Sequence, residues 1–498
     1  MSDQHVVAPK LNALGRSPGF VAVVTVLILT EIVSAFELSM MYVTLPTLIK
    51  DFQVDANTVA WVVTIYLLVS ASSALLGGRF GDMYGRRKVM VVVLVLAGIG
   101  SFVSLIGGSL EMIILGRGIQ GTAGAVMGLA FGLAREHLAE KKLSVGVSMI
   151  GASALIAGAG GALIAGFMID AFSWHGIFLF AGLLAFIAAI ATLLVIPRDA
   201  ARVNERGALD FLGAVLLPLG ASGILLGLSN SSKAGWGSFS GGGLLGIGLL
   251  IIAIWVLWEL KAPRPIVNLR MFKNRQIALI MSATFIAAIG PIGGMSVPSQ
   301  MVLQYPPAVG FGLGFTATAA GVFSCVIALV GYVFSPLGGK LANKFGARMV
   351  FVTGLLLMTL AIIPILLTLG NMPVFLMAMI VNAIGIALTF GALPNVMIEA
   401  IPESHTSETA GTNTMVRNIG QSVATAVGAF LLARHQDPVT TLVGEQGIIE
   451  AFVFVGAFGA CSVVLALFMR RRPDVWQPND VQPVETIEDP DKQPTGIG

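Results

Sequence analysis

Fourteen long apolar runs constrain this chain more than any other feature of its sequence. An α-helix needs about 20 apolar residues to cross the hydrocarbon core of a bilayer. The runs cover residues 20–46, 57–78, 88–107, 110–134, 144–168, 175–196, 208–229, 240–260, 276–303, 313–338, 348–369, 373–398, 409–433 and 448–469. Only 11% of the 498 residues are charged, whereas soluble domains carry about 25%. We therefore predict an all-α polytopic membrane protein with 14 transmembrane helices.

The Lys and Arg residues lie mainly in every second loop between these runs, which places them on one side of the membrane. With the N-terminus placed in the cytoplasm, 24 of the 29 lie in cytoplasmic segments. Three lie in outer loops, Lys50, Lys233 and Arg434, and two lie within spans, Arg117 and Arg417. Because positive charge accumulates on the cytoplasmic side of membrane proteins, we expect both termini in the cytoplasm. We expect the chain to lie in the cell (plasma or inner) membrane.

Several classes of protein are disfavoured by the residue inventory. Cys325 and Cys461 both lie in apolar runs and offer no disulfide framework. The five His residues are scattered, and the chain has no HExxH, GxSxG or P-loop pattern. The basic residues are confined mainly to loops, which disfavours nucleic acid as a partner. We therefore expect no enzyme, no metal site and no cofactor.

Two cytoplasmic loops repeat each other at a distance of 261 residues. The loop after the second span reads Gly78-Arg-Phe-Gly-Asp-Met-Tyr-Gly-Arg-Arg, and the loop after the tenth reads Gly339-Lys-Leu-Ala-Asn-Lys-Phe-Gly-Ala-Arg. Glycine, Asp or Asn, an aromatic residue, glycine and arginine recur in register. In a membrane bundle built from such a parallel repeat, the substrate site lies at the interface of the repeats.

The first of these loops resembles the hallmark cytoplasmic loop of the major facilitator superfamily. Over residues 20–470 the chain also resembles the fourteen-span drug:proton antiporter branch of that family. The segments that carry this resemblance are Phe36–Pro46 with Glu37 where Asp is usual, Trp61–Leu67, Arg117–Gly121, and Leu209-Asp210 with Trp236-Gly237. The resemblance implies the major facilitator fold, with two six-helix bundles and a two-helix insertion between them.

The domain boundaries follow from this division of the spans. The expected parts are a cytoplasmic tail over 1–19, an N-terminal bundle over 20–200, an inserted hairpin over 201–262, a C-terminal bundle over 263–472 and a tail over 473–498. The last segment is Pro-rich and acidic, and we expect it to be disordered because it cannot bury a core.

Three ionisable residues within spans are candidates for proton coupling, since each costs a few kcal/mol to place there. Burial favours the neutral form of a carboxyl group, so Glu37 could carry a proton in one access state and release it in the other. Glu31 is a second proton site or a contact for a substrate cation. Arg117 keeps its proton and would act on a neighbouring carboxylate. The structural alternatives are a fixed interhelical hydrogen bond for Glu37, an arginine pair for Glu31 and a backbone carbonyl contact for Arg117.

The repeated loops are candidates for conformational gating, because charged clusters at helix ends can hold one access state closed. The residues assigned to gating are Gly78, Asp82, Gly85, Arg86, Arg87, Gly339, Asn343, Gly346 and Arg348. Arg86 and Arg87 also set the topology by their charge. We expect Asp82 to accept hydrogen bonds from backbone N–H groups and from an arginine of the opposing half.

The expected substrate pocket is lined by aromatic, methionine and polar side chains of the pathway spans. Methionine surfaces repack around varied ligands, although each such residue also suits a core or lipid-facing position. The candidates are Phe36, Met41, Trp61, Tyr66, Gln120, Met127, Phe390, Asn395, Met415 and Arg417. Arg417 either binds an anionic substrate group or holds Glu399.

The sequence thus favours a secondary active transporter that exports hydrophobic or amphipathic small molecules by alternating access. Its energy source would be the proton gradient, and its partners the substrate, protons and membrane lipids, with the chain working as a monomer. One departure from the family pattern leaves open whether substrate and proton move in opposite directions or together. Ala162 stands where the fifth-span antiporter motif has Pro. The alternatives are a symporter, a transporter of lipid or steroid-like substrates, and a non-transporting receptor or scaffold on the same fold.

Overall fold

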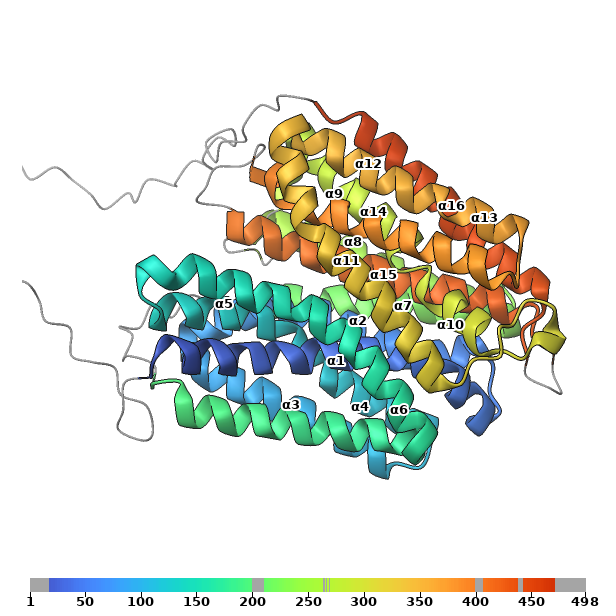
Figure 1. Cartoon of the computed structure of the whole chain (residues 1–498), viewed down its shortest axis with the longest axis horizontal. Helices are drawn as coiled ribbons and strands as arrows, with labels where there is room; N and C mark the ends of the chain where they lie inside the picture. Colours follow the sequence, from blue (N-terminus) through green and yellow to red (C-terminus); the bar gives the residue numbers. More distant parts are fainter. Residues whose placement is uncertain are drawn as a thin grey trace, which may run out of the picture.

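The computed structural model describes residues 18–198, 210–262, 265, 267, 269–398, 406–437 and 442–470. The described part is helical apart from short connections and one isolated β-bridge between Gln436 and Val443 (Figure 1). Residues 1–17 of the predicted N-terminal tail, the predicted tail 473–498 and the segment 199–209 lie outside these residues.

The helices are long and mostly apolar, as the runs in the sequence indicate. The first part of the chain forms α1 (Phe20–Phe52), α2 (Ala56–Tyr84), α3 (Arg86–Ile106), α4 (Leu110–Gln120), η1 (Gly121–Ala125), α5 (Val126–His137), α6 (Glu140–Val195), α7 (Phe211–Ala234), η2 (Phe239–Gly243) and α8 (Leu244–Lys261). The remainder forms η3 (Leu269–Lys273), α9 (Arg275–Ala287), η4 (Ala288–Ile292), α10 (Ser296–Gln304), η5 (Pro307–Val309), α11 (Ala317–Phe345), α12 (Ala347–Leu360), α13 (Ile362–Leu367), α14 (Met372–Ile398), α15 (Thr406–Ala433) and α16 (Glu445–Leu467).

Eleven helical segments of the described chain are long and apolar enough to cross a membrane. The all-α membrane architecture is therefore confirmed, and the number fourteen stays a prediction. The difference has identifiable causes. The helix α6 runs through two predicted spans and is interrupted only at Ser173, whose φ of 61° and ψ of 179° are not helical. The helix α7 has only a shorter apolar stretch, Val215–Ser231, and α15 is not among the eleven segments.

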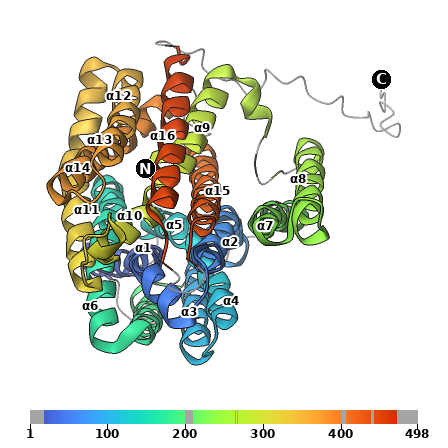
Figure 2. The same cartoon turned by 90° about the vertical axis from the view of Figure 1, so that its right-hand side faces the viewer.

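The helices form two layers that meet along α2, α6, α11 and α15. Figure 1 shows α1 to α6 on one side and α9 with α12 to α16 on the other. The helix α11 packs on α6, and α15 packs on α2. The pair α7 and α8 pack on each other and lie at the periphery beside α2 and α15 (Figure 2). We refer to α1–α6 as the first half and to α9–α16 as the second half.

The two repeated loops have the same backbone and the same contact. Gly85 ends α2 with φ 98° and ψ 127°, and Gly346 ends α11 with φ 93° and ψ 137°. Only glycine adopts such positive φ values readily. Arg87 donates to the carbonyl of Leu193 near the end of α6, and Arg348 donates to the carbonyl of Leu467 at the end of α16. The repeat in the sequence is therefore a repeat in the structure.

The predicted span 276–303 is broken in its middle. The helix α9 ends at Ala287, and the π-helical turn η4 contains Gly290, with ψ −115°, and Pro291. The chain becomes α-helical again at Ser296. Proline removes a helix hydrogen bond, and irregular backbone at membrane depth is tolerated where it is buried in protein or lines a cavity. Here the break borders the cavity described below.

Candidate transport pathway

The two halves contact each other at the ends of the helices opposite to the repeated loops. The Gln304 side chain of α10 donates to the carbonyl of Val43 in α1 at 2.9 Å. The backbone N–H of Thr318 in α11 donates to the carboxylate of Asp170 in α6 at 2.8 Å. The Gln436 side chain after α15 accepts from the backbone N–H at the start of α2. These three contacts join the two halves at this end.

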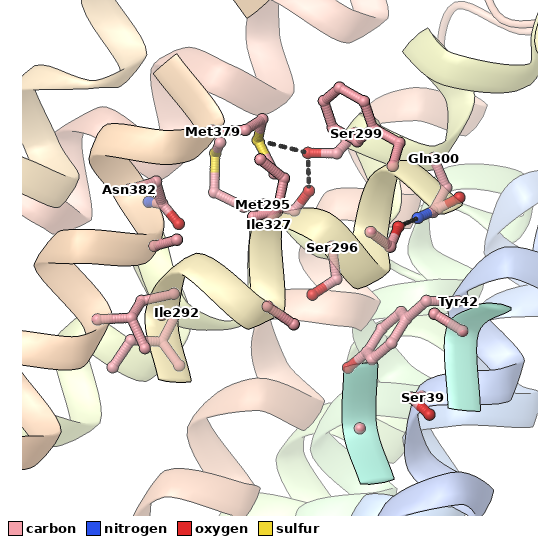
Figure 3. A pocket seen from close by; sticks show the side chains of 18 of the residues that line it. Ser39, Tyr42, Ile292, Met295, Ser296, Ser299, Gln300, Ile327, Met379 and Asn382 are labelled. Carbon is pink, nitrogen blue, oxygen red and sulfur yellow. Dashed lines mark hydrogen bonds between the residues drawn. The ribbon is translucent and has the colours of Figure 1, made fainter. Parts of the chain in front are cut away.

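A cavity of about 340 Å³ lies between the halves. Figure 3 labels ten of the residues that line it. Most of its wall comes from η4, α10, α11 and α14 of the second half, while α1 contributes Ser39 and Tyr42 and α6 contributes Gly158 and Ala162. The Tyr42 side chain reaches towards Ser296 of α10, so it bridges the halves. The lining described here includes no acidic and no basic side chain.

A separate buried polar centre occupies the first half. Glu37 is fully buried in α1, and neither of its carboxylate oxygens has a hydrogen-bond partner among the described residues. Arg117 of α4 is its charged neighbour. Glu31 is 4% exposed, and its Oε2 likewise lacks a partner. A carboxyl group without partners in such a site is stabilised in its neutral form, which is the property that a proton carrier needs.

Arg117 is held in place by contacts within the first half. Its Nε donates to the carbonyl of Val62 at 3.1 Å, and its Nη1 donates to Gln120 Oε1 at 2.8 Å. Its guanidinium lies 4.1 Å from the centre of the Tyr66 ring, and the Tyr66 hydroxyl donates to the carbonyl of Ser34 in α1. Nη2 has no partner in the described chain. The arginine thus links α1, α2 and α4 and leaves one donor available.

The network extends from Arg117 into α3. Gln120 donates through Nε2 to Ser101 Oγ at 2.6 Å, and Ser101 donates to the carbonyl of Ala97. Tyr66 lies within electrostatic reach of Glu31, Glu37 and Arg117. The proton-coupling residues predicted from the sequence are therefore brought together with Tyr66 and Gln120, two residues predicted for the pocket. Their roles stay predictions.

The second half presents a different surface. Ser299 and Gln300 of α10 lie on the cavity wall, where Gln300 donates to Ser324 of α11 at 3.1 Å. Asn382 of α14 is 3% exposed and lines the cavity, and its Nδ2 has no partner among the residues described. Met295 and Met379 flank these polar groups (Figure 3). This wall is apolar and contains flexible methionine side chains together with a few hydrogen-bonding groups. Such a composition is typical of small-molecule sites.

Arg417 on α15 stands next to this wall. Its guanidinium lies 5.1 Å from the centre of the Phe390 ring, and Phe390 lines the cavity. No hydrogen bond or ion pair of Arg417 occurs within the described residues, and no charged group acts on it. Glu399, its predicted alternative partner, lies outside them.

The other predicted pocket residues are distributed over several surfaces. Phe36 and Met41 are buried in the first-half core, and Phe36 packs against Phe180 at a ring distance of 5.1 Å. Trp61 is 3.4 Å from Ser229 of α7, and Met415 packs among side chains of α2, α7 and α8. Met127 and Asn395 are partly buried and lie outside the cavity lining. Their part in substrate binding stays a prediction.

The gating residues contact their own halves in this structure. Arg86 donates to the carbonyl of Gly132 and pairs with Glu136 of α5 at 3.1 Å. Arg87 and Arg348 bind the ends of α6 and α16, as described above. The side chains of Asp82 and Asn343 lie outside the described part of the structure. Arg79, in the same loop as Asp82, donates to the carbonyl of Pro265, between α8 and η3, at 2.7 Å. A contact of the assigned gating residues with the opposing half stays a prediction.

Several cavity residues were missed by reasoning from sequence. Gln300, Met379 and Asn382 are not distinguished by any motif, and Tyr42 lies in the Phe36–Pro46 segment without having been assigned to the pocket. Asn382 had a usable signal, because it is an amide inside an otherwise apolar run, and polar groups within membranes tend to be interfacial or functional. Gln300 lies two residues after Pro298 in the run 276–303, and a proline inside a span indicates irregular backbone near a cavity.

Comparison with known proteins decides the family. The model of the Major Facilitator Superfamily matches residues 27–425 and 301–494. The chain belongs to the Major Facilitator Superfamily. It is accordingly a multi-pass membrane transporter and not an enzyme.

Relatives and solved structures agree with this assignment. The chain is 26% identical over 441 residues to the multidrug transporter protein MdtP of Bacillus subtilis, covering 86% of this chain and 79% of the relative. It is 22% identical over 437 residues to the multidrug resistance protein B homolog of Mycobacterium tuberculosis, covering 85% and 78%.

Two solved structures share the superfamily fold. A bacterial homolog of the human lysosomal transporter Spinster, in an inward-facing and unoccupied conformation, superposes with a TM-score of 0.66 at 14% identity, covering 93% of this chain and 100% of that one. The xylose transporter XylE of E. coli superposes with a TM-score of 0.58 at 13% identity, covering 90% and 97%.

Proposed function

We propose that this protein is a proton-coupled exporter of hydrophobic or amphipathic small molecules, working by antiport and alternating access. The observation that carries the proposal is Glu37, a fully buried carboxyl group beside Arg117 whose two oxygens have no hydrogen-bond partner among the described residues. Such a group has no structural bond to maintain and can exchange a proton. The relatives named as multidrug transporters support the same substrate class.

The proposed cycle uses the two halves differently. Substrate binds in the cavity between them from the side of the repeated loops, which we place in the cytoplasm together with both termini. A proton from outside reaches Glu37 after the halves have exchanged their contacts, and Arg117 favours release of that proton when it lies close to the carboxylate. The protein works in the cell membrane as a monomer surrounded by lipid. No cofactor takes part, since the proton gradient supplies the energy.

The test is transport by purified protein in liposomes with an imposed pH gradient. The probes are ethidium as a cation, pyrenebutanamide as a neutral molecule and pyrenebutyrate as an anion. We expect at least one probe to accumulate only when the gradient drives protons in the opposite direction. Flux that is independent of the gradient would refute proton coupling, and flux that follows the protons in the same direction would establish symport.

A further inference from the structure

Arg417 is a charged residue in the second half that the proton-coupling network does not include. It sits eleven residues into α15, well inside the helix Thr406–Ala433. Its side chain is partly buried, stacks on Phe390 and pairs with no acidic group of the described chain. An ionisable side chain inside the membrane that no carboxylate neutralises is a candidate for function.

The surroundings of Arg417 differ from those of an arginine that only links helices. A guanidinium that only links helices would donate to carbonyl or carboxylate oxygens, as Arg117 does in the first half. Arg417 instead offers its ring contact with Phe390, one of the residues that line the cavity. The edge of the guanidinium keeps five donors for an external acceptor.

A second group in the same wall also lacks a partner. Asn382 lies on α14 eight residues before Phe390, so the two are about 12 Å apart along the helix axis. The Asn382 Nδ2 is a buried donor without an acceptor in the described structure. A buried donor left unsatisfied costs about 1–3 kcal/mol, which a ligand that brings an acceptor would remove.

We propose, on the basis of the proposed export function, that this cavity selects aromatic or amphipathic anions. The negatively charged group binds Arg417 beside Phe390, and the apolar body extends about 12 Å towards Asn382, where an oxygen of the ligand accepts from Nδ2. Met295, Met379 and Tyr42 contact the apolar body. Cations are disfavoured, because Arg417 repels them and the lining offers them no carboxylate.

Binding to the full-length protein in nanodiscs tests this assignment with three pyrene compounds of matched size. The compounds are pyrenebutyrate, the neutral pyrenebutanamide and the cationic pyrenebutyl-trimethylammonium, and energy transfer from tryptophan to pyrene reports binding, with empty nanodiscs as the background. We expect the wild type to bind the anion at least about 10-fold more tightly than the cation, as a charge-assisted hydrogen bond allows.

Substitutions of Arg417 separate its charge from its packing. We expect Arg417→Gln to weaken binding of the anion by about 10- to 100-fold and to change binding of the neutral amide by less than about twofold. Arg417→Lys should restore part of the loss. Lys142→Gln is the matched control, because it removes another cation that lies over an aromatic ring, Phe20, far from the cavity wall.

The outcomes distinguish this assignment from the export function. Equal binding of the anion by the wild type and Arg417→Gln overturns the anion site, and so does a preference of the wild type for the cation. Charge-dependent binding of the anion without any gradient-driven flux upholds the anion site and overturns proton-coupled export. Asn382→Leu supplies a second readout. Binding of pyrenebutyrate and pyrenebutanamide should change by less than about twofold, since neither carries an oxygen at its pyrene end, whereas a pyrenebutyrate with a hydroxyl group at the far side of the pyrene should bind about 5- to 10-fold more weakly.

Discussion

The two halves of this transporter place their charged groups in opposite environments. In the first half Arg117 is fully buried and bonded to its own helices, and it acts on the unpartnered Glu37. In the second half Arg417 is partly exposed, unpaired within the described chain and next to the cavity. We propose from this difference that one half serves proton exchange and the other substrate contact, although their loops repeat each other.

Removing the carboxyl group of the first half should have the largest effect. We expect Glu37→Gln to reduce gradient-driven flux to the level of empty liposomes, because glutamine keeps the shape of the side chain and cannot release a proton. Binding of the substrate should change by less than about threefold, since Glu37 does not line the cavity. Glu445→Gln, at the exposed start of α16, is the control. Flux that survives in Glu37→Gln would refute the division between the halves.

The anchoring of Arg117 can be tested with a conservative change. Lysine keeps the charge and loses the planar set of donors, so Arg117→Lys gives up contacts with Val62 and Gln120. We expect flux to fall about 10-fold, the size of a lost charge-assisted hydrogen bond, with substrate binding unchanged. The matched change Arg434→Lys, at an exposed position directly after α15, should leave flux at the wild-type rate. If Arg117→Lys weakened substrate binding as much as it reduced flux, the two halves would not be separate in function.

The contact between α6 and α11 tests the movement of the halves. A Cβ atom at Gly166 would lie 2.2 Å from the carbonyl oxygen of Ala317. We expect Gly166→Ala to separate the halves at this end and to reduce flux about 10-fold, since overpacking costs roughly 1–3 kcal/mol. Labelling of a cysteine introduced at Thr318 should increase at the same time. Gly160→Ala is the control, because nothing lies within 4 Å of its added Cβ.

The glycines of the repeated loops should respond equally. Gly85→Ala and Gly346→Ala both place a side chain at a φ above 90°, which costs about 1–2 kcal/mol. Thermal unfolding of the purified protein in detergent measures the loss, and the two variants should agree within about 0.5 kcal/mol. Gly78→Ala, at an α-helical position with open space, gives the baseline. Unequal losses would show that the two loops are not equivalent in energy.

The smallest effect is expected from the soft part of the cavity wall. Met379→Leu conserves volume and apolar character, so binding of any one substrate should change by less than about threefold. The relative order of substrates of different shape should change more than the mean affinity, because leucine adapts less than methionine. A competition series of pyrene compounds with different chain lengths measures this. If the order of affinities does not change, the substrates do not contact α14.

The fold followed from the sequence because membrane spans and repeated loops leave local signals. The run lengths predicted nearly every helix, and the loop at Gly78 predicted the equivalent loop at Gly339. The joint at Ser173 was not predictable in detail, because the sequence shows two spans and does not reveal that helical geometry continues almost unbroken between them. Residues such as Tyr42 and Asn382 meet only through tertiary packing, so no spacing in the sequence places them in one cavity.

An anionic substrate bound at Arg417 also sets how much charge each proposed transport cycle moves across the membrane. A monovalent anion that leaves the cell while one proton enters moves two charges across the membrane in the same electrical sense. Each charge contributes about 2.3 kcal/mol per 100 mV of membrane potential, so the potential would add about 4.6 kcal/mol to each turnover. A carrier with this stoichiometry would continue to export when the pH difference has vanished and the voltage remains, whereas exchange of one cation for one proton would stop.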